Sequence, residues 1–212
     1  ANSSTPSRYM AILGTVVLVF ISTHMVNFWG KMHFEELPLH TTKLYPPMTN
    51  KASGADFYLT TNGSFLPKEQ IEVKNGNQLF IKDDISSQLA EANPEFKMDG
   101  SNPKFAEGYK DLHGLVMTFF GKTKEGFPKN DNALIYTWLY VLSMAVLGFH
   151  LWHGFSSAFQ SLGLRTASYK KAIITAGKGF AVVISALFAI IPLVIYYYPV
   201  SYTHLRAHET KP

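Results

Sequence analysis

The sequence contains no cysteine, which excludes a disulfide framework and any metal site built on thiolates. Formally charged residues are missing from three long apolar blocks: Tyr9 to Trp29, Leu134 to Phe159 and Phe180 to Tyr198. In a soluble domain, apolar residues recur at helix or strand spacing along the whole chain. Their concentration into three blocks therefore argues against a soluble all-α protein.

Each block is long enough to cross a membrane as a helix. A hydrocarbon core of roughly 30 Å needs about 20 helical residues, and the first block has 21. Aromatic residues such as Trp29 and Trp138 gather near the block ends, where amphipathic rings prefer the headgroup layer. The sequence thus predicts an all-α membrane protein, with transmembrane helices at residues 9–30, 133–161 and 179–198.

The connection between the first two blocks, residues 31–132, is polar and contains two hairpin signals. The stretches FYLTTNGSFL and IEVKNGNQLFIK each place Asn-Gly between β-forming residues. They predict two hairpins between Phe57 and Lys82, within an insertion outside the membrane. We expect Ile85 to Phe105 to be irregular, and residues 109–120 to form a short helix lying on the membrane surface.

The short connection between the second and third blocks predicts the orientation of the chain. Residues 162–178 carry basic side chains and no acidic one: Arg165, Lys170, Lys171 and Lys178. Short loops rich in Lys and Arg stay in the cytoplasm, so we expect this loop inside and the insertion outside. Residues 199–212 resemble translated sequencing-adapter sequence, so we expect a non-native tail without function.

Three of the eight histidines lie within the apolar blocks: His24, His150 and His153. Ionisable residues at membrane depth are rare and usually mark a pathway or a cofactor. A neutral imidazole can also simply form a hydrogen bond to a neighbouring helix. Both interpretations stay open for each histidine taken alone.

The residues that follow His150 favour a flat ligand. Gly154 and Ser157 lie four and seven positions further on, along the same helical face, and are too small to block a porphyrin. Electron-transfer haems take two axial imidazoles, which makes His24 and His150 the candidate iron ligands. Counting at 1.5 Å per residue places these two histidines roughly 9 Å apart in depth, so we expect two haems rather than one shared haem.

Two stretches carry a resemblance to a known family. VFISTHMVNFW and VLSMAVLGFHLWHGFSSAFQSLGL resemble the last three helices of the cytochrome b membrane anchor of succinate dehydrogenase or fumarate reductase, of the five-helix, two-haem type. In that family the axial histidine is followed by a glycine four residues later and another thirteen residues later. His150, Gly154 and Gly163 satisfy this frame, whereas His153 does not. His24 occupies the place of the ligand of the other haem.

The resemblance implies a function. Such an anchor binds a flavoprotein and an iron–sulfur subunit and passes electrons between them and membrane quinone through two haem b groups. Succinate chemistry takes place on the partner subunits. The implied location is the bacterial cytoplasmic (inner) membrane, with membrane lipid and menaquinone or ubiquinone as contacts and no nucleic-acid partner. His153 is expected to lie near a haem propionate or the quinone.

The sequence departs from the family pattern in two places. The family normally begins with two further helices, each supplying a haem ligand, so the chain is expected to be a fragment that lacks them. Most of residues 38–108 has no counterpart in the usual short outer loop. Two alternatives also stay open: a cytochrome b of another quinone-linked oxidoreductase, and a non-haem transporter that uses the histidines as proton-relay or packing groups.

The charge pattern makes the topology testable. Protease added to cells with a permeabilised outer layer should cut within residues 31–132 and leave the loop around Lys170 intact, because only the short basic loop follows the charge rule. The fragments are identified by mass spectrometry. Cleavage beside Lys170 under these conditions would invert the orientation.

Overall fold

The computed structural model describes residues 5–44, 55–92, 104–163 and 169–198. The chain divides into two compact units. The helical unit comprises Ala1–His24, Met117–Thr123 and Pro128–Pro212, and the sheet unit comprises Met25–Val116 and Lys124–Phe127. The expected tail, residues 199–212, lies outside the described residues.

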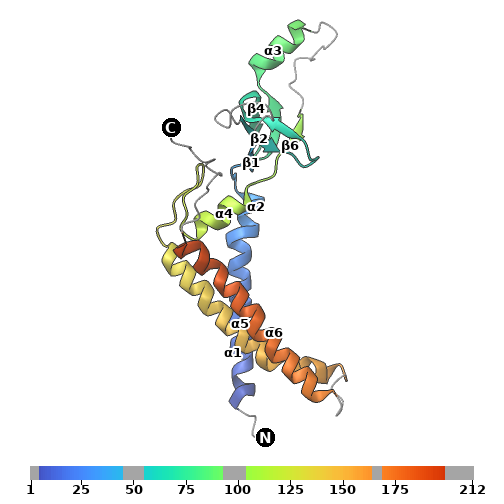
Figure 1. Cartoon of the computed structure of the whole chain (residues 1–212), viewed down its shortest axis with the longest axis vertical. Helices are drawn as coiled ribbons and strands as arrows, with labels where there is room; N and C mark the ends of the chain where they lie inside the picture. The colour runs from blue at the N-terminus through green and yellow to red at the C-terminus, as the bar shows by residue number, and fades with distance from the viewer. Residues whose placement is uncertain (1–4, 45–54, 93–103, 164–168, 199–212) are drawn as a thin grey trace, which may run out of the picture. The chain divides into compact units, whose positions relative to one another are not determined.

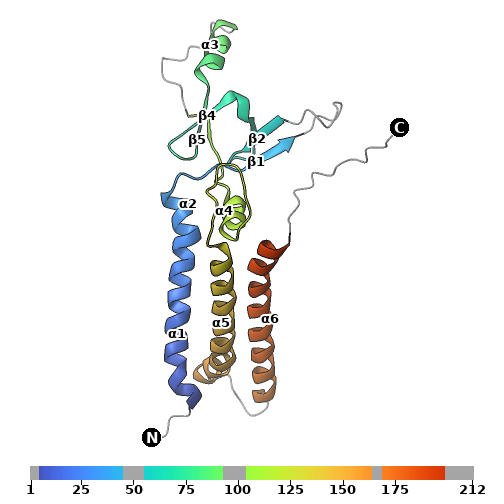
Figure 2. The same cartoon turned by 90° about the vertical axis from the view of Figure 1, so that its left-hand side faces the viewer.

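Three helices are long and apolar enough to cross a membrane. They are α1 (Thr5–His24), which is followed by a π-helical segment η1 (Met25–Gly30) and a short helix α2 (Lys31–Phe34), together with α5 (Ala133–Ser161) and α6 (Lys170–Tyr197). Figures 1 and 2 show α1, α5 and α6 side by side, and α5 contacts both of the others. The prediction of a mostly helical protein with three membrane-length helices is confirmed.

The helix ends differ from those expected. Helix α6 begins at Lys170, so residues 170–178 of the expected basic loop are helical, and the first candidate span continues to Phe34 rather than ending at residue 30. Hydropathy marks the part of a helix that fits the hydrocarbon core, whereas the backbone hydrogen bonds continue into the polar layer. Residues 164–168 of that loop lie outside the described residues.

Small residues bring α5 and α6 together. A side chain added at Gly177 would overlap the Phe155 ring, and one added at Gly148 would lie 2.9 Å from Ser185 Oγ, so both glycines lie where the helices meet. Gly177, Ala181 and Ser185 follow one another at four-residue spacing on α6, and Ala181 is almost fully buried. Close approach through such small residues drives helix association where lipid removes the hydrophobic driving force.

The sheet unit contains two antiparallel three-stranded sheets with strand orders β1-β2-β3 and β4-β5-β6. Their strands are β1 (Thr41–Leu44), β2 (Ala55–Leu59), β3 (Phe65–Pro67), β4 (Ile71–Lys74), β5 (Gln78–Ile81) and β6 (Ala106–Glu107). Leu39, Ile71 and Leu79 form the buried core. Short elements η3 (Lys68–Gln70), α3 (Asp83–Ala92) and α4 (Leu112–Phe119) complete the described chain.

Both predicted hairpins are present: β2 pairs with β3, and β4 pairs with β5. The turn residues Asn75 and Gly76 have φ of 50° and 80°, a conformation that Asn-Gly adopts with little strain. Strands β1 and β6, which extend each hairpin to a sheet, were not predicted because their pairing partners lie far away in the sequence.

The expectation of irregular structure after Ile85 is wrong up to Ala92, which ends α3. The short helix expected within residues 109–120 is present as α4, and its contact with a membrane surface stays a prediction.

Asp111 fastens the start of α4. Its side chain is 2 % exposed, and its Oδ1 accepts a hydrogen bond of 2.8 Å from the Gly114 amide, as a helix N-cap does. Lys124 forms an ion pair with Asp111 Oδ2, and His40 Nδ1 lies 3.6 Å from Oδ1. Burial raises the pKa of Asp111, but the Lys124 hydrogen bond, the Gly114 amide and the charges of Lys124 and His40 together hold that pKa below its ordinary value.

Replacing Asp111 tests this arrangement. An asparagine side chain retains a capping oxygen but leaves the Lys124 ammonium unpaired, so Asp111→Asn should destabilise the sheet unit by about 2 kcal/mol or more. Because the folded pKa is depressed, the stabilisation from the wild-type carboxylate is present above its unfolded pKa and is lost as pH falls through the lower, folded value. Hydrogen exchange of α4 amides at several pH values measures both effects.

The control for this substitution is Asp131→Asn, because Asp131 is 79 % exposed in its pair with Lys129. An exposed pair contributes little, so the control should exchange like the wild type. Equal exchange in the two variants would show that the buried pair does not hold α4.

Candidate functional site

His150 lies on α5 and faces α1. A side chain added at Gly14 of α1 would lie 3.4 Å from His150 Cε1 and 3.9 Å from Nδ1, so the imidazole packs directly over that glycine. Within the described part of the chain, His150 Nδ1 is buried and has no hydrogen-bond partner. A buried polar atom without a partner costs about 1–3 kcal/mol of stability. The Nδ1 atom of His150 therefore has a lone pair or a proton that remains available to a ligand.

His24 lies in a cluster of aromatic rings. Its ring centroid is 5.8 Å from that of Phe20 on the same helix and 5.8 Å from that of Tyr140 on α5. Tyr140 also contacts Phe119 and Phe120 edge-on, at 5.6 Å and 5.1 Å between centroids. These rings surround one side of the imidazole with apolar, polarisable surface.

The two contacts place the histidines at different levels. His150 lies against Gly14, and His24 lies against Tyr140, so α1 and α5 are antiparallel here. Each helix advances ten residues between the two contacts, which corresponds to about 15 Å at 1.5 Å per residue. Two imidazoles that ligate one iron atom have to lie at nearly one level, so this separation is too large for His24 and His150 to hold a single iron between them. The separation between the two histidines is larger than the roughly 9 Å counted from the sequence.

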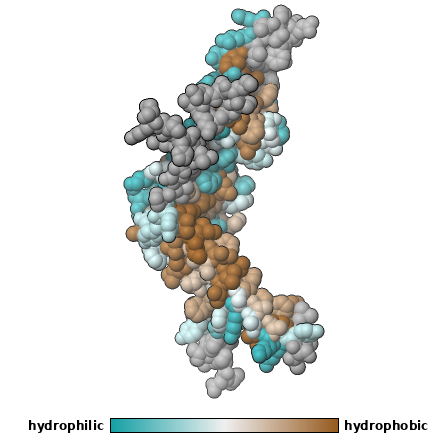
Figure 3. All heavy atoms as spheres, in the orientation of Figure 1, coloured by the Kyte–Doolittle hydropathy of each residue, from teal (hydrophilic) through white to brown (hydrophobic). Residues whose placement is uncertain are grey.

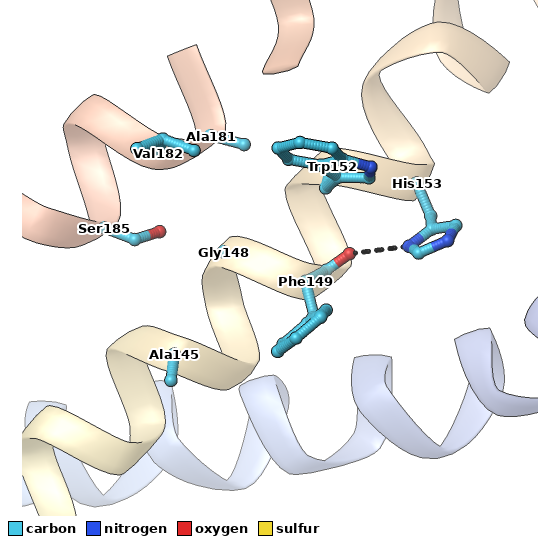
Figure 4. Close-up of a pocket in the computed structure, with 8 residues that line it drawn as sticks. All are labelled: Ala145, Gly148, Phe149, Trp152, His153, Ala181, Val182 and Ser185. Carbon is cyan, nitrogen blue, oxygen red and sulfur yellow. Dashed lines mark hydrogen bonds between the residues drawn. The ribbon is translucent and has the colours of Figure 1, made fainter. Parts of the chain in front are cut away.

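His153 lies one turn beyond His150 on α5. Its Nδ1 is 3.1 Å from the Phe149 carbonyl oxygen, and because a carbonyl only accepts, Nδ1 carries the proton and donates it. In Figure 4 the imidazole points away from Ala181 and Ser185 of α6. His153 is exposed and lies at the edge of an apolar groove between α5 and α6. His153 thus lies beside the groove between α5 and α6, whereas His150 packs over Gly14 of α1.

Gly154 and Ser157 do not line an open slot beside His150. A side chain added at Gly154 would meet Met10 of α1 at 3.7 Å, so α1 covers this position. Ser157 is exposed, and its carbonyl accepts a hydrogen bond of 3.2 Å from the Ser161 hydroxyl. Small residues at helical spacing permit a flat ligand, but they equally permit a close helix neighbour. In this chain the neighbour is α1.

Sequence reasoning missed the residues that hold the two imidazoles. Gly14 and Tyr140 each contact a histidine from the opposite helix. A glycine within an apolar membrane-length block is a signal for close helix packing, so Gly14 was recognisable as a contact position. Its pairing with His150 was not, because it depends on the register between α1 and α5.

The donor set fits haem ligation only in part. His24 and His150 each provide one imidazole in an apolar setting, which suits an axial ligand. Among the described residues, no group of three or more His, Cys, Asp or Glu comes together as it would for a metal ion held by protein alone. A bis-imidazole haem at either level would need its second axial ligand from outside the described residues.

Comparisons with protein-family models, curated proteins and solved structures found no match to this chain.

The contact between Gly14 and His150 is open to a direct test. Alanine at position 14 would place its Cβ at ordinary contact distance, so Gly14→Ala should change stability by less than about 1 kcal/mol. Gly14→Leu should drive the imidazole out of place and lower stability by roughly 1–3 kcal/mol. Thermal unfolding of the purified protein in detergent measures the difference.

A matched control for Gly14→Leu is available on α6. A side chain added at Gly179 meets nothing within 4 Å, so Gly179→Leu should be tolerated. If Gly14→Leu is as stable as this control, the close packing of α1 on His150 does not exist in the membrane protein.

Proposed function

We propose that this chain is part of a membrane cytochrome b that anchors succinate dehydrogenase or fumarate reductase. The single observation that carries the proposal is the placement of His24 and His150. They lie on two adjacent membrane-length helices, at levels about 15 Å apart along the helix pair, and His150 Nδ1 is buried without a partner. Two separate imidazoles at two levels suit a chain that serves two haems.

In this proposal, His24 and His150 each bind one haem iron through a ring nitrogen. The haem, when bound, supplies one-electron redox chemistry. Phe20 and Tyr140 contact the ring of His24 and limit its orientation, and α1 packs over His150 at Gly14. His24 is exposed whereas the Nδ1 atom of His150 is buried, so the surroundings would tune the potentials at the two levels differently.

Each haem would also need a second protein ligand, which the described residues do not provide at either level. The resembled family supplies these ligands from two further helices. His153 acts from the next turn, because its Nδ1 proton leaves Nε2 to accept a hydrogen bond from a quinol hydroxyl or from a protonated haem propionate.

The remaining parts of the proposal follow from the resemblance. The partners are a flavoprotein and an iron–sulfur subunit, and the electron carrier in the membrane is menaquinone or ubiquinone. The protein would lie in the bacterial inner membrane, with the basic stretch Arg165 to Lys178 on the cytoplasmic side. The absence of acidic residues from this stretch supports that side.

A visible spectrum separates the proposal from its rivals. Reduced-minus-oxidised spectra of membranes that contain the whole protein should show the absorption bands of haem b. A cytochrome gives these bands and a non-haem transporter does not. Reduction of the haem by succinate, in the presence of the partner subunits, distinguishes this anchor from a cytochrome b of another quinone-linked oxidoreductase.

Substitution of the histidines assigns the ligands. His24→Ala and His150→Ala should each remove one haem and about half of the haem absorbance, because each provides an axial ligand of a different iron. His153→Ala should retain both haems with a shift in potential at most. Redox titration of the purified complex resolves the two components.

His33→Ala is the matched control for these substitutions, because His33 is exposed and stacks on Trp29 at 4.3 Å between ring centroids. It should leave both haems in place. Loss of a haem from His153→Ala together with retention in His150→Ala would contradict the assignment.

A further inference from the structure

An apolar groove runs along the surface between α5 and α6. Its volume is about 350 Å³, and its lining is almost entirely hydrocarbon. Gly148 and Ala181, where the helices meet, form its floor, and the exposed side chains of Phe149, Trp152 and Val182 form its walls. Figure 4 shows these residues around the gap between the two helices.

A lysine lies at one end of this groove. Lys178 Nζ is 5.0 Å from the centroid of the Trp152 ring, in a cation–π contact. It precedes the groove residue Ala181 by three positions, on the side of the connection between α5 and α6. The sequence contains no Asp or Glu from residue 132 to residue 198, so neither helix offers this ammonium group a carboxylate.

The position of Lys178 along α6 corresponds to the edge of the hydrocarbon core. The uncharged stretch Phe180 to Tyr198 begins two residues later. Its 19 residues span about 28 Å as a helix, close to the thickness of a bilayer core. Lys178 therefore lies at headgroup level, where Trp152 is also favoured, and the groove extends from there into the acyl-chain layer. Figure 3 shows apolar residues gathered over the middle of these helices.

We propose that this groove binds one phospholipid with an anionic headgroup. The phosphate lies at Lys178 and contacts its ammonium group, while Trp152 holds the glycerol region beside it. One acyl chain lies along the floor formed by Gly148 and Ala181. The charge of Lys178, which no acid on α5 or α6 balances, selects an anionic lipid over a zwitterionic one. This site lies between α5 and α6, and the proposal does not depend on haem.

Native mass spectrometry of the full-length protein, delipidated in detergent and titrated with dioleoyl-phosphatidylglycerol, tests the proposal. One molecule should bind, and it should bind more tightly than dioleoyl-phosphatidylcholine. Lys178→Gln should weaken binding about fivefold, the effect of one lysine near an anionic headgroup. Lys178→Arg, which retains the charge and the contact with Trp152, should restore it.

Two further variants test the groove itself. Ala145 is exposed and lines the groove, so Ala145→Phe should fill it and abolish binding of the lipid. Ala186→Phe adds the same ring at an exposed position outside the groove and should bind like the wild type. Lys171→Gln, which removes a charge near the start of α6, should also bind like the wild type.

Several outcomes would overturn the proposal. Equal affinity for the two lipids, with no effect of Lys178→Gln, would mean that the groove only holds acyl chains without selecting a headgroup. Displacement of the lipid by inorganic phosphate alone would mean that the acyl chain does not contribute. Crosslinking of Ala145→Cys to a helix of another chain in membranes, with no retained lipid, would mean that protein covers the groove.

Discussion

The structure depends on how three helices, each long and apolar enough to cross a membrane, approach one another. For helices in lipid, the backbone hydrogen bonds stay within each helix and association comes from close packing rather than from the hydrophobic effect. Helix α5 meets α6 through Gly148 and Gly177, and it meets α1 through Gly14 and Gly154. The glycines thus determine which faces of α5 are in contact, and every side chain of interest on α5 is placed by that choice.

The two sides of α5 have different chemistry as a result. His150 faces α1 and is held over Gly14, whereas Trp152 faces the groove beside α6. Residues only two positions apart on a helix point about 200° apart at 3.6 residues per turn. One short stretch can therefore present an imidazole to the interior of one helix pair and a tryptophan to the apolar groove beside α6.

The sheet unit is stabilised by a different kind of interaction. Its core is small, consisting of Leu39, Ile71 and Leu79 with a few partly buried neighbours. The buried carboxylate of Asp111 joins the start of α4 to Lys124, and Lys110 donates to the Met32 and Glu35 carbonyls near the end of α2. Hydrogen bonds and ion pairs of charged side chains thus stabilise short elements that hydrophobic burial alone would stabilise only weakly.

The sequence by itself determined the three membrane-length helices and both hairpins, because hydropathy over about 20 residues and an Asn-Gly turn are local signals. It also singled out His24, His150 and His153 as imidazoles within apolar blocks, and their role stays a prediction. Only the tertiary structure decided that α1 covers Gly154, that Tyr140 contacts His24, and that β1 and β6 complete the sheets. These contacts join residues far apart in the chain, and their register depends on how whole elements pack, which no local pattern specifies.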